Sequence, residues 1–353
     1  MTGALTDPWL AFEGHEQAVV AELDGVKVTI AIHSTVLGPA LGGTRMAMYA
    51  DAVDSSAAAY ADALRLSRAM TYKNALAGLD HGGGKAVIVA DPTVKTAALL
   101  HAYGRLVDGL GGRYVTAGDV GMTVDDMDVI GEVCRWTTGR SPENGGVGDS
   151  GILTACGVFE GMRACAESVW GSTDLDGRRI AVIGAGKVGG RLIGHLHDAG
   201  ALVAAVDPSP SARQATTDAY PSVSFVETID ELLDRDLDVV SPNALGGFLT
   251  RDRAETMRTA LVCGGANNQL VEPAIGDLLA GRGIVYAPDF MVNCGGVIQV
   301  AEELVGCDLV RARERTARVF QTTGRVLERA RREGLTPVAA AEREAEDRIR
   351  SAS

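Results

Sequence analysis

The sequence predicts a two-domain α/β protein with a cleft between the domains. Its 353 residues are enough for two domains that each have their own core. Segments with strand and helix patterns alternate through both halves of the chain. Residues 139–151 (GRSPENGGVGDSG) are rich in glycine, proline, serine and asparagine, which makes them the best candidate linker.

This linker sets the expected domain boundaries. We place an N-terminal α/β domain, which would bind the substrate and carry the catalytic groups, at 1–144. The second domain is expected at 145–309. Residues from about 310 to 353 are arginine-rich with a helical periodicity that is broken near Pro337. We expect these C-terminal helices to pack back on the first domain.

Composition excludes several classes of function. The chain is 46% hydrophobic and 22% charged, as globular proteins are. A net charge of −13 and only 5% aromatic residues argue against nucleic acid or an anionic membrane as partner. No run of eighteen apolar residues and no basic-then-apolar N-terminus occurs, so we expect a cytoplasmic protein. The six cysteines include no Cys-x-x-Cys pair, so we expect reduced thiols and no metal site.

Four segments define the first domain. Residues 27–33 (KVTIAIH) alternate at period two and predict a strand. Residues 54–71 are rich in alanine and begin with an Asp/Ser start signal, which predicts a helix. Residues 86–90 (AVIVA) and 113–117 (RYVTA) have strand compositions.

Two lysines stand out in a chain that otherwise uses arginine. Only five of the 33 basic residues are lysine, and Lys73 and Lys85 lie twelve residues apart around the glycines at 82–84. A buried lysine amine can lose its proton near another cation, which a guanidinium cannot. The glycines would let the backbone approach a small molecule closely. Because Lys73, Lys85 and Asp119 each lie at the end of a different element, they can converge on one cleft. The alternative is that both lysines are simply exposed.

A glycine pattern opens the second domain. Residues 178–183 (RRIAVI) predict a buried strand that leads directly into GAGKVG at 184–189 and then a helix. The next strand, 201–206, ends at Asp207. A glycine pattern between a strand and a helix, with an acidic residue at the end of the next strand, is typical of an NAD-binding Rossmann domain.

Each part of this pattern has a physical role. The first glycine makes a tight turn, the second lets the backbone reach a pyrophosphate, and the third lets helix and strand pack. Asp207 would bind the adenosine ribose and repel a 2′-phosphate, which favours NAD over NADP, although Arg213 nearby weakens that preference. The expected cofactor-binding residues of the pattern are Gly184, Ala185, Gly186, Lys187, Val188, Gly189 and Asp207.

Several longer motifs resemble one enzyme family, the Glu/Leu/Phe/Val dehydrogenases. They occur in order as LGPALGGTR (37–45), the segment 73–85, YVTAGDVG (114–121), GANNQL (265–270) and YAPDFMVNCGGV (286–297). Within the family, the stretch CRWTTGRSPE (134–143) makes the chain most similar to the valine (branched-chain amino acid) dehydrogenases.

The resemblance implies roles for individual residues. Lys73, helped by the backbone at Gly42 and Gly43, would bind the substrate α-carboxylate. Lys85 in its neutral form would activate the attacking water, and Asp119 would shuttle protons. The residues expected near substrate and nicotinamide are Asn268, Asn267, Thr154 and Asn243.

An apolar pocket would select the side chain of the substrate. Val297 and Val300 are three apart on an expected helical face and, with Leu41, Met70 and Ala117, would line a pocket without a cation. That argues for valine, leucine or isoleucine over glutamate. Core packing explains these five positions equally well, and discrimination against phenylalanine depends on a few methylene groups.

The expected reaction is oxidative deamination of a branched-chain L-amino acid by NAD to the 2-oxo acid, ammonia and NADH, and the reverse reductive amination. Alternatives are a phenylalanine or leucine dehydrogenase of the same family, a 2-hydroxy acid dehydrogenase, and an NAD-binding sensor without turnover. The paired lysines favour an amine substrate over a hydroxy acid. A sensor would need only the glycine pattern. The resemblance also implies a homo-oligomer, a dimer or an octamer.

Overall fold

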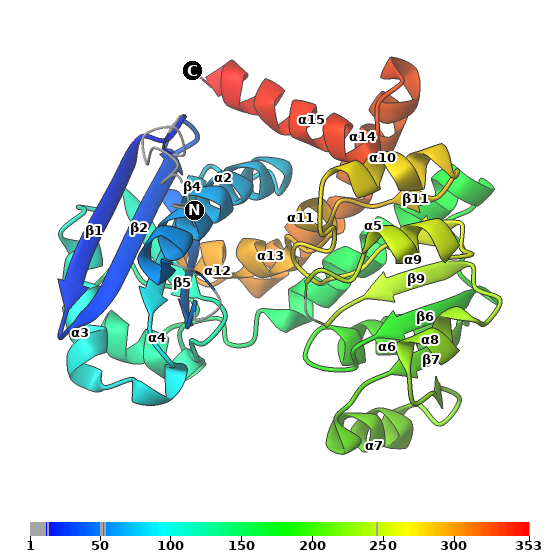
Figure 1. Cartoon of the computed structure of the whole chain (residues 1–353), viewed down its shortest axis with the longest axis horizontal. Coiled ribbons are helices and arrows are strands. Elements are labelled where there is room, and N and C mark those ends of the chain that lie inside the picture. The colour runs from blue at the N-terminus through cyan, green and yellow to red at the C-terminus, as the bar shows by residue number, and fades with distance from the viewer. Residues whose placement is uncertain (1–11, 13, 50–51, 53, 245, 353) are drawn as a thin grey trace, which may run out of the picture. The chain divides into compact units, whose positions relative to one another are not determined.

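The computed structural model describes residues 12, 14–49, 52, 54–244 and 246–352 (Figure 1). Contacts divide the chain into two compact units. Unit 1 contains Met1–Asp149, Gln299–Leu309 and Glu346–Ser353, and unit 2 contains Ser150–Ile298 and Val310–Ala345. Some residues lie outside this described set. In the regions expected to form the first domain they are 1–11, 13, 50, 51, 53 and 353, and in the second domain the residue is 245.

The C-terminal helices depart from expectation. Most of 310–353 belongs to unit 2 and not to the first domain, because helix α14 (Val319–Glu333) buries its apolar face against helix α5 (Gly151–Trp170). Gly161 of α5 leaves room for helix α11 (Asp289–Val292), since a Cβ there would lie 2.4 Å from Val292 Cγ1. Only the end of α15 (Pro337–Ala352) joins unit 1, where Arg348 donates to the carbonyl oxygen of Ala75 over 2.6 Å.

The segment 299–309, expected at the end of the second domain, also belongs to unit 1. The carboxylate of Glu303 accepts hydrogen bonds from the amides of Gly139 (2.9 Å) and Val147 (3.0 Å). The side-chain amide of Gln299 donates to the carbonyl oxygen of Val147 over 3.0 Å. These bonds satisfy backbone groups of the glycine-rich stretch that has no regular partner, and they attach 299–303 to it.

Unit 1 is built on a mixed five-stranded sheet in the order β1-β2-β4-β3-β5. The strands β1 and β2 form an antiparallel hairpin, β4 is antiparallel to β2, and β3 is parallel to both β4 and β5. The strands are β1 (Gln17–Leu23), β2 (Val26–Ser34), β3 (Ala40–Ala47), β4 (Gly82–Val89) and β5 (Tyr114–Gly118). The helices are α2 (Ser55–Leu76), α3 (Ala97–Asp108) and α4 (Val124–Gly131), with short 3-10 turns at Pro92–Val94, Pro142–Asn144 and Glu303–Val305.

Helix α2 packs closely on this sheet because the residues at the contact are small. The carboxylate of Asp54 caps the helix by accepting from the amides of Ser56 and Ala57. A Cβ on Gly83 of β4 would lie 2.1 Å from the amide nitrogen of Thr71 on α2. A Cβ on Gly84 would lie 2.5 Å from the ring of Tyr114. Glycines 83 and 84 therefore serve the packing of α2 and β5 against β4, a role that the sequence interpretation did not include.

Unit 2 is a parallel six-stranded sheet in the order β11-β10-β9-β6-β7-β8. This is the order of a doubly wound Rossmann domain, in which the order of successive strands reverses between β6 and β9. The strands are β6 (Arg179–Ile183), β7 (Leu202–Val206), β8 (Ser224–Phe225), β9 (Val239–Pro242), β10 (Leu261–Val262) and β11 (Val285–Tyr286). The remaining helices are α6 (Gly189–Asp198), α7 (Pro210–Ala219), α8 (Ile229–Leu233), α9 (Arg251–Thr256), α10 (Ala274–Gly281), α11 (Asp289–Val292), α12 (Gly295–Glu302) and α13 (Leu309–Ala317). The predicted two-domain α/β fold class is confirmed.

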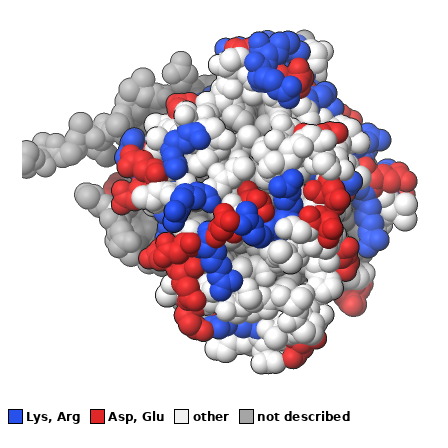
Figure 2. All heavy atoms as spheres, turned by 90° about the vertical axis from the view of Figure 1, so that its right-hand side faces the viewer, with Lys and Arg blue, Asp and Glu red and all other residues white. Residues whose placement is uncertain are grey.

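The surface carries charges of both signs. Figure 2 shows one face of the molecule, on which basic and acidic side chains are interspersed and do not form an extended basic patch. In the described part of the chain, none of the helices combines the length and apolarity that a membrane crossing requires. Within that same part, no cluster of three or more His, Cys, Asp or Glu side chains is placed to hold a metal ion.

The close approach of α2 and β4 predicts a large stability cost for Gly83→Ala. The added methyl group would overlap backbone and cannot be accommodated by a side-chain rotation, so we expect a loss of about 1–3 kcal/mol or more in the free energy of unfolding. Guanidinium titration followed by circular dichroism measures it. The matched control is Gly324→Ala in α14, where a Cβ meets no atom within 4 Å and better helix propensity should stabilise. Equal midpoints for Gly83→Ala and wild type would contradict the packing argument.

Candidate active site

A buried ion pair lies at the centre of unit 1. The ammonium group of Lys85 on β4 donates to Oδ2 of Asp119 over 2.6 Å. Lys85 is 5% exposed, so its charge depends on this partner for compensation. Asp119 directly follows β5, and its amide still bonds to the carbonyl oxygen of Thr44 on β3 over 3.0 Å. Strand β3 thus lies between the two partners and holds them in register.

Gly43 makes room for this arrangement. It pairs with Ala117 of β5 in the parallel register, and a Cβ on Gly43 would lie 2.8 Å from the Cβ of Asp119. Any larger residue would push the carboxylate away from Lys85. A steric reason for glycine at this position therefore accompanies the backbone role that the sequence resemblance implies.

The electrostatics of Asp119 follow from its two cationic neighbours. Burial by itself would raise the pKa of Asp119, but the charges of Lys85 and Arg45 outweigh it and lower the pKa to about 2. The carboxylate is therefore ionised at every pH at which the protein would work. A carboxylate with so low a pKa is a weak base, so a proton that it accepts is readily passed on.

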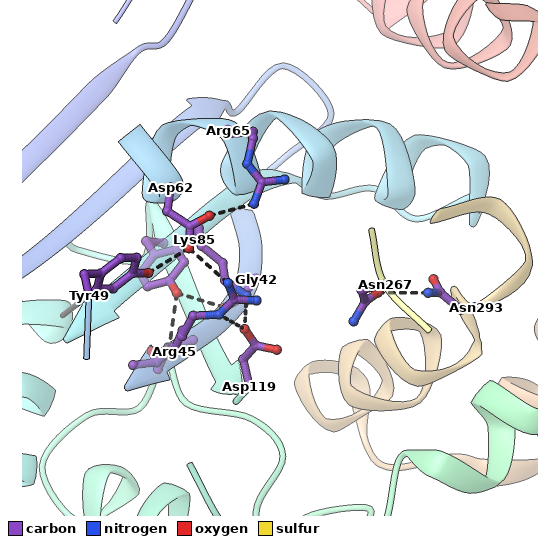
Figure 3. A network of polar contacts seen from close by, with 12 residues as sticks. Gly42, Arg45, Tyr49, Asp62, Arg65, Lys85, Asp119, Asn267 and Asn293 are labelled. Atoms are coloured by element: carbon purple, nitrogen blue, oxygen red, sulfur yellow. Dashed lines mark hydrogen bonds and ion pairs between the residues drawn. The ribbon is translucent and has the colours of Figure 1, made fainter. Parts of the chain in front are cut away.

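Arg45 is the residue that sequence reasoning missed. Its Nε donates to Oδ2 of Asp119 over 3.2 Å and its Nη1 donates to Oδ2 of Asp62 on α2 over 2.9 Å (Figure 3). Asp62 also accepts from the hydroxyl of Tyr49 (2.7 Å) and from Arg65 (2.6 Å). Arg45 ends the LGPALGGTR motif, which was a signal for it, but the spacing of Asp62 along the chain offered none.

Lys73 lies in the last turn of α2. The next residue, Asn74, attaches this end of the helix to the sheet. The buried amide of Asn74 donates to the carbonyl oxygens of Leu41 on β3 (3.1 Å) and Gly82 on β4 (2.6 Å). One turn earlier, Met70 approaches Gly42, where a Cβ would lie 3.3 Å from Met70 Cγ and only 1.8 Å from the carbonyl oxygen of Gly84. The end of α2 that carries Lys73 therefore lies against the strands that carry Gly42 and Lys85.

The five apolar positions are found in two places. In unit 1, Leu41 is fully buried and Ala117 is 7% exposed, while Met70 is partly buried. Val297 and Val300 lie one turn apart on α12, as expected of a helix, but contacts assign Val297 to unit 2 and Val300 to unit 1. Their joint role in one pocket stays a prediction.

In unit 2 the glycine pattern forms a tight turn between β6 and α6. Gly184 has a φ of +93°, a left-handed conformation that favours glycine. A Cβ on Gly189 would lie 1.8 Å from the carbonyl oxygen of Gly184, so the helix can start here only with glycine. Gly186 and Lys187 are exposed, and nothing within 4 Å would meet a Cβ on Gly186. The backbone at Gly186 is thus open to a ligand at the start of α6.

Asp207 lies at the end of β7 and is held by backbone amides. Its Oδ2 accepts from Ala185 over 2.7 Å and its Oδ1 from Ser209 over 2.8 Å. The carboxylate therefore lies directly beside the glycine turn. On the other side of that turn, Asn243 follows β9. Its side-chain Oδ1 accepts from the backbone amide of Gly265 (2.8 Å), and its backbone amide donates to the carbonyl oxygen of Ile183 (2.7 Å). The open turn, with Asp207 on one side and Asn243 on the other, fits a dinucleotide at the point where the strand order reverses.

The other residues expected near nicotinamide are also in unit 2. Thr154, in the first turn of α5, donates to the carbonyl oxygen of Ser150 over 3.0 Å, and Gly296 packs against it. Asn267 accepts a hydrogen bond from the buried Asn293 over 2.8 Å (Figure 3). Asn268 is exposed and has a φ of +52°, a left-handed conformation uncommon outside glycine. Such backbone strain is concentrated at functional sites, which is a reason to test Asn268 directly.

Comparison with known proteins agrees with these geometries. Two family models match: the dimerisation domain of Glu/Leu/Phe/Val dehydrogenases over residues 17–135, and Glutamate/Leucine/Phenylalanine/Valine dehydrogenase over residues 210–349. A valine dehydrogenase of Streptomyces virginiae is 52% identical over 96% of this chain and 95% of its own length. A leucine dehydrogenase of Bacillus cereus is 45% identical over 96% of this chain and 91% of its own length.

Solved structures extend the comparison to the fold. The crystal structure of L-tryptophan dehydrogenase from Nostoc punctiforme is similar to this chain with a TM-score of 0.83 and 39% identity, covering 96% of this chain and 97% of that one. Identity at this level over nearly the whole length, together with the two family models, establishes common ancestry. The chain belongs to the Glu/Leu/Phe/Val dehydrogenase family.

Proposed function

We propose that this enzyme catalyses the NAD-dependent oxidative deamination of a branched-chain L-amino acid, with valine preferred, to the 2-oxo acid, ammonia and NADH, and the reverse reaction. The observation that carries the proposal is the buried contact of 2.6 Å between Lys85 and Asp119. An amine and a carboxylate in direct contact can exchange the protons that deamination requires. The 52% identity to valine dehydrogenases supports the choice of substrate.

Binding of the substrate would depend on Lys73. Its ammonium group, at the end of α2 that lies against β3 and β4, would pair with the α-carboxylate. The backbone at Gly42 and Gly43, in the strand against which the end of α2 lies, would complete the site. This contact would fix the orientation of Cα, which is the first requirement for hydride transfer.

Proton transfer would depend on Lys85 and Asp119. NAD, when bound, supplies the acceptor for the hydride that leaves Cα. Lys85 in its neutral form would take a proton from the water that attacks the resulting imine carbon, and Asp119 would pass a proton to the amine, which leaves as ammonia. The short contact between the two side chains allows the proton to move between them without solvent.

Selection of the side chain would fall to Leu41, Met70, Ala117, Val297 and Val300. All five are apolar, so they offer no charge to a glutamate side chain. Leucine and isoleucine are the next substrates in order. A tryptophan dehydrogenase at 39% identity shows that an aromatic substrate occurs among the relatives, so phenylalanine belongs in the test.

Preference for NAD over NADP would follow from Asp207 and from the position of Arg213. The guanidinium of Arg213 makes two hydrogen bonds to Glu227, of 2.9 and 2.6 Å, and lies 5.6 Å from the ring centre of Phe225. Arg213 is thus engaged by a carboxylate of its own and is not free to bind a 2′-phosphate. Asp207 would repel that phosphate.

We also propose a cytoplasmic homo-oligomer, a dimer or an octamer. The first family model is described as a dimerisation domain, and it covers the sheet of unit 1. Strand β1 is an edge of that sheet and exposes Val20 at 68%, so a second copy could pair with it.

The proposed function is tested by NADH absorbance at mildly alkaline pH with NAD and single L-amino acids. We expect fast NADH formation with valine and leucine, slower with phenylalanine and none with glutamate. Lys85→Ala should lower kcat about 10²- to 10⁴-fold, the usual contribution of an acid–base group. The matched control is Lys27→Ala, which removes an exposed lysine of β2 whose ammonium group donates to the hydroxyl of Ser56 over 2.7 Å.

Three results would contradict the proposal. NAD binding without turnover of any amino acid would favour the alternative of a non-catalytic NAD sensor. Turnover that survives in Lys85→Ala would remove Lys85 from the mechanism. Turnover of a 2-hydroxy acid would favour the other rival.

The preference for NAD predicts a stepwise change of cofactor. Asp207→Ser should raise the ratio of kcat/KM for NADP to that for NAD, because the repelling charge is lost. Adding Glu227→Gln should raise the ratio roughly 10- to 100-fold further, the equivalent of one charge-assisted bond from the released Arg213. Initial rates with both cofactors measure this. If a third change, Arg213→Gln, left the gain intact, Arg213 would not be the phosphate-binding group.

A further inference from the structure

The Lys85–Asp119 pair is one end of a longer chain of alternating charges. From β4 to α2 the order is Lys85, Asp119, Arg45, Asp62 and Arg65, each in contact with the next (Figure 3). The first four side chains are between 7% and 18% exposed. Burying a guanidinium between two carboxylates costs desolvation free energy, which is offset only when the ion-pair geometry is good.

Two atoms of Arg45 face two different carboxylates. Nε lies 3.2 Å from Asp119 and Nη1 lies 2.9 Å from Asp62. A lysine could not hold both, because its ammonium is a single point, whereas the guanidinium is a planar fork. Asp62 is itself oriented by Tyr49 and Arg65, so the fork is anchored from α2.

The two cations bind the same oxygen of Asp119. Lys85 Nζ and Arg45 Nε both contact Oδ2, and Figure 3 shows the second oxygen of that carboxylate directed away from them. Two bonds to one oxygen, from β4 on one side and β3 on the other, fix the rotation of the carboxyl group. The free rotation of an aspartate at the end of a strand would otherwise allow either oxygen to face the substrate.

Asp62 also connects the carboxylate of Asp119 to the end of α2 that carries Lys73, where the substrate carboxylate would bind. Asp62 and Lys73 lie on α2 about three turns apart, a spacing that returns to the same face of a helix. The contact between Arg45 and Asp62 therefore joins β3 to the helix that carries Lys73. A displacement of α2 would change the position of Arg45, and through it the orientation of Asp119.

We propose that Arg45, anchored by Asp62, is a positioning residue that holds Oδ2 of Asp119 against Lys85 and leaves Oδ1 as the oxygen that exchanges a proton with the substrate. This inference rests on the proposed function for its kinetic part only. The charged groups that act on Asp119 from the surrounding elements are Lys85 on β4, Arg45 on β3 and, through Arg45, Asp62 on α2.

The proposal predicts a defect in kcat and in pH dependence for Arg45→Gln. We expect kcat for valine to fall about 10- to 100-fold, the usual cost of a misplaced group, with KM for valine nearly unchanged because Lys73 is intact. The acidic limb of the profile of kcat against pH should move to higher pH, since Asp119 loses one of the two cations that lower its pKa. Arg45→Lys should restore part of the pH profile and little of kcat. Asp62→Asn should lower kcat by a smaller factor.

The matched control is Arg329→Gln in α14. Arg329 is 17% exposed, and like Arg45 it bonds two carboxylates, through Nε to Glu333 and through Nη1 to Glu344. Loss of this fork should change thermal stability and leave kcat, KM and the pH profile at wild-type values. If Arg45→Gln behaved like Arg329→Gln, Arg45 would be merely structural and the proposal would be wrong.

A readout that needs no turnover separates this proposal from the proposed function. Carbon-13 NMR of labelled aspartate, with Asp119→Asn for assignment, follows the Asp119 carboxyl as the pH is lowered. We expect it to stay ionised in wild type, Arg329→Gln and Asp62→Asn and to titrate at higher pH in Arg45→Gln, because only Arg45→Gln removes a cation that contacts Asp119. Absence of activity in wild type would refute the proposed function, while an unshifted titration in Arg45→Gln would refute the positioning role. If Arg45→Gln did not fold, kcat of Asp62→Asn would decide the question, since a wild-type value would refute the positioning role.

Discussion

The organisation of unit 1 depends on the compensation of one buried ammonium group. Lys85 is 5% exposed in the middle of a sheet, and a charge in that position is tolerated only with a partner in direct contact. Asp119 provides the contact, and Arg45 and Asp62 continue the alternation of charge outward to α2. Because Asp119 has two cationic neighbours, its carboxylate remains ionised and its pKa is low.

Backbone packing made possible by glycine brings these charges together. Gly42, Gly43, Gly83 and Gly84 each stand where a Cβ would overlap a neighbouring strand, helix or ring. Without them β3, β4 and α2 would separate, and the contact between Lys85 and Asp119 would lengthen. The proposed binding of a substrate carboxylate by the backbone at Gly42 and Gly43 would involve two of the same residues.

In unit 2, backbone amides at the glycine turn would contact the anionic part of the proposed cofactor. The tight turn at Gly184, the contact of Gly189 with that turn and the open position of Gly186 present helix amides to a ligand. Asp207 is already fixed by two backbone amides, so its orientation does not depend on a bound ribose. Under the proposed function, selectivity for NAD would follow from local bonds within the β6–α6–β7 segment and its neighbour Glu227.

The sequence by itself determined the fold class, the first strand–helix–strand unit of the Rossmann domain and the family. These depend on local patterns, namely the strand and helix periods and a glycine spacing between a strand and a helix. It also singled out Lys85 and Asp119, which lie 2.6 Å apart. Only the tertiary structure decided that Arg45 joins Asp119 to Asp62, because residues from three elements meet there without a spacing rule. It also decided that residues 310–345 belong to unit 2, where α14 packs on α5. Helical periodicity tells which face of α14 is apolar, but which surface covers that face depends on contacts far apart in the chain.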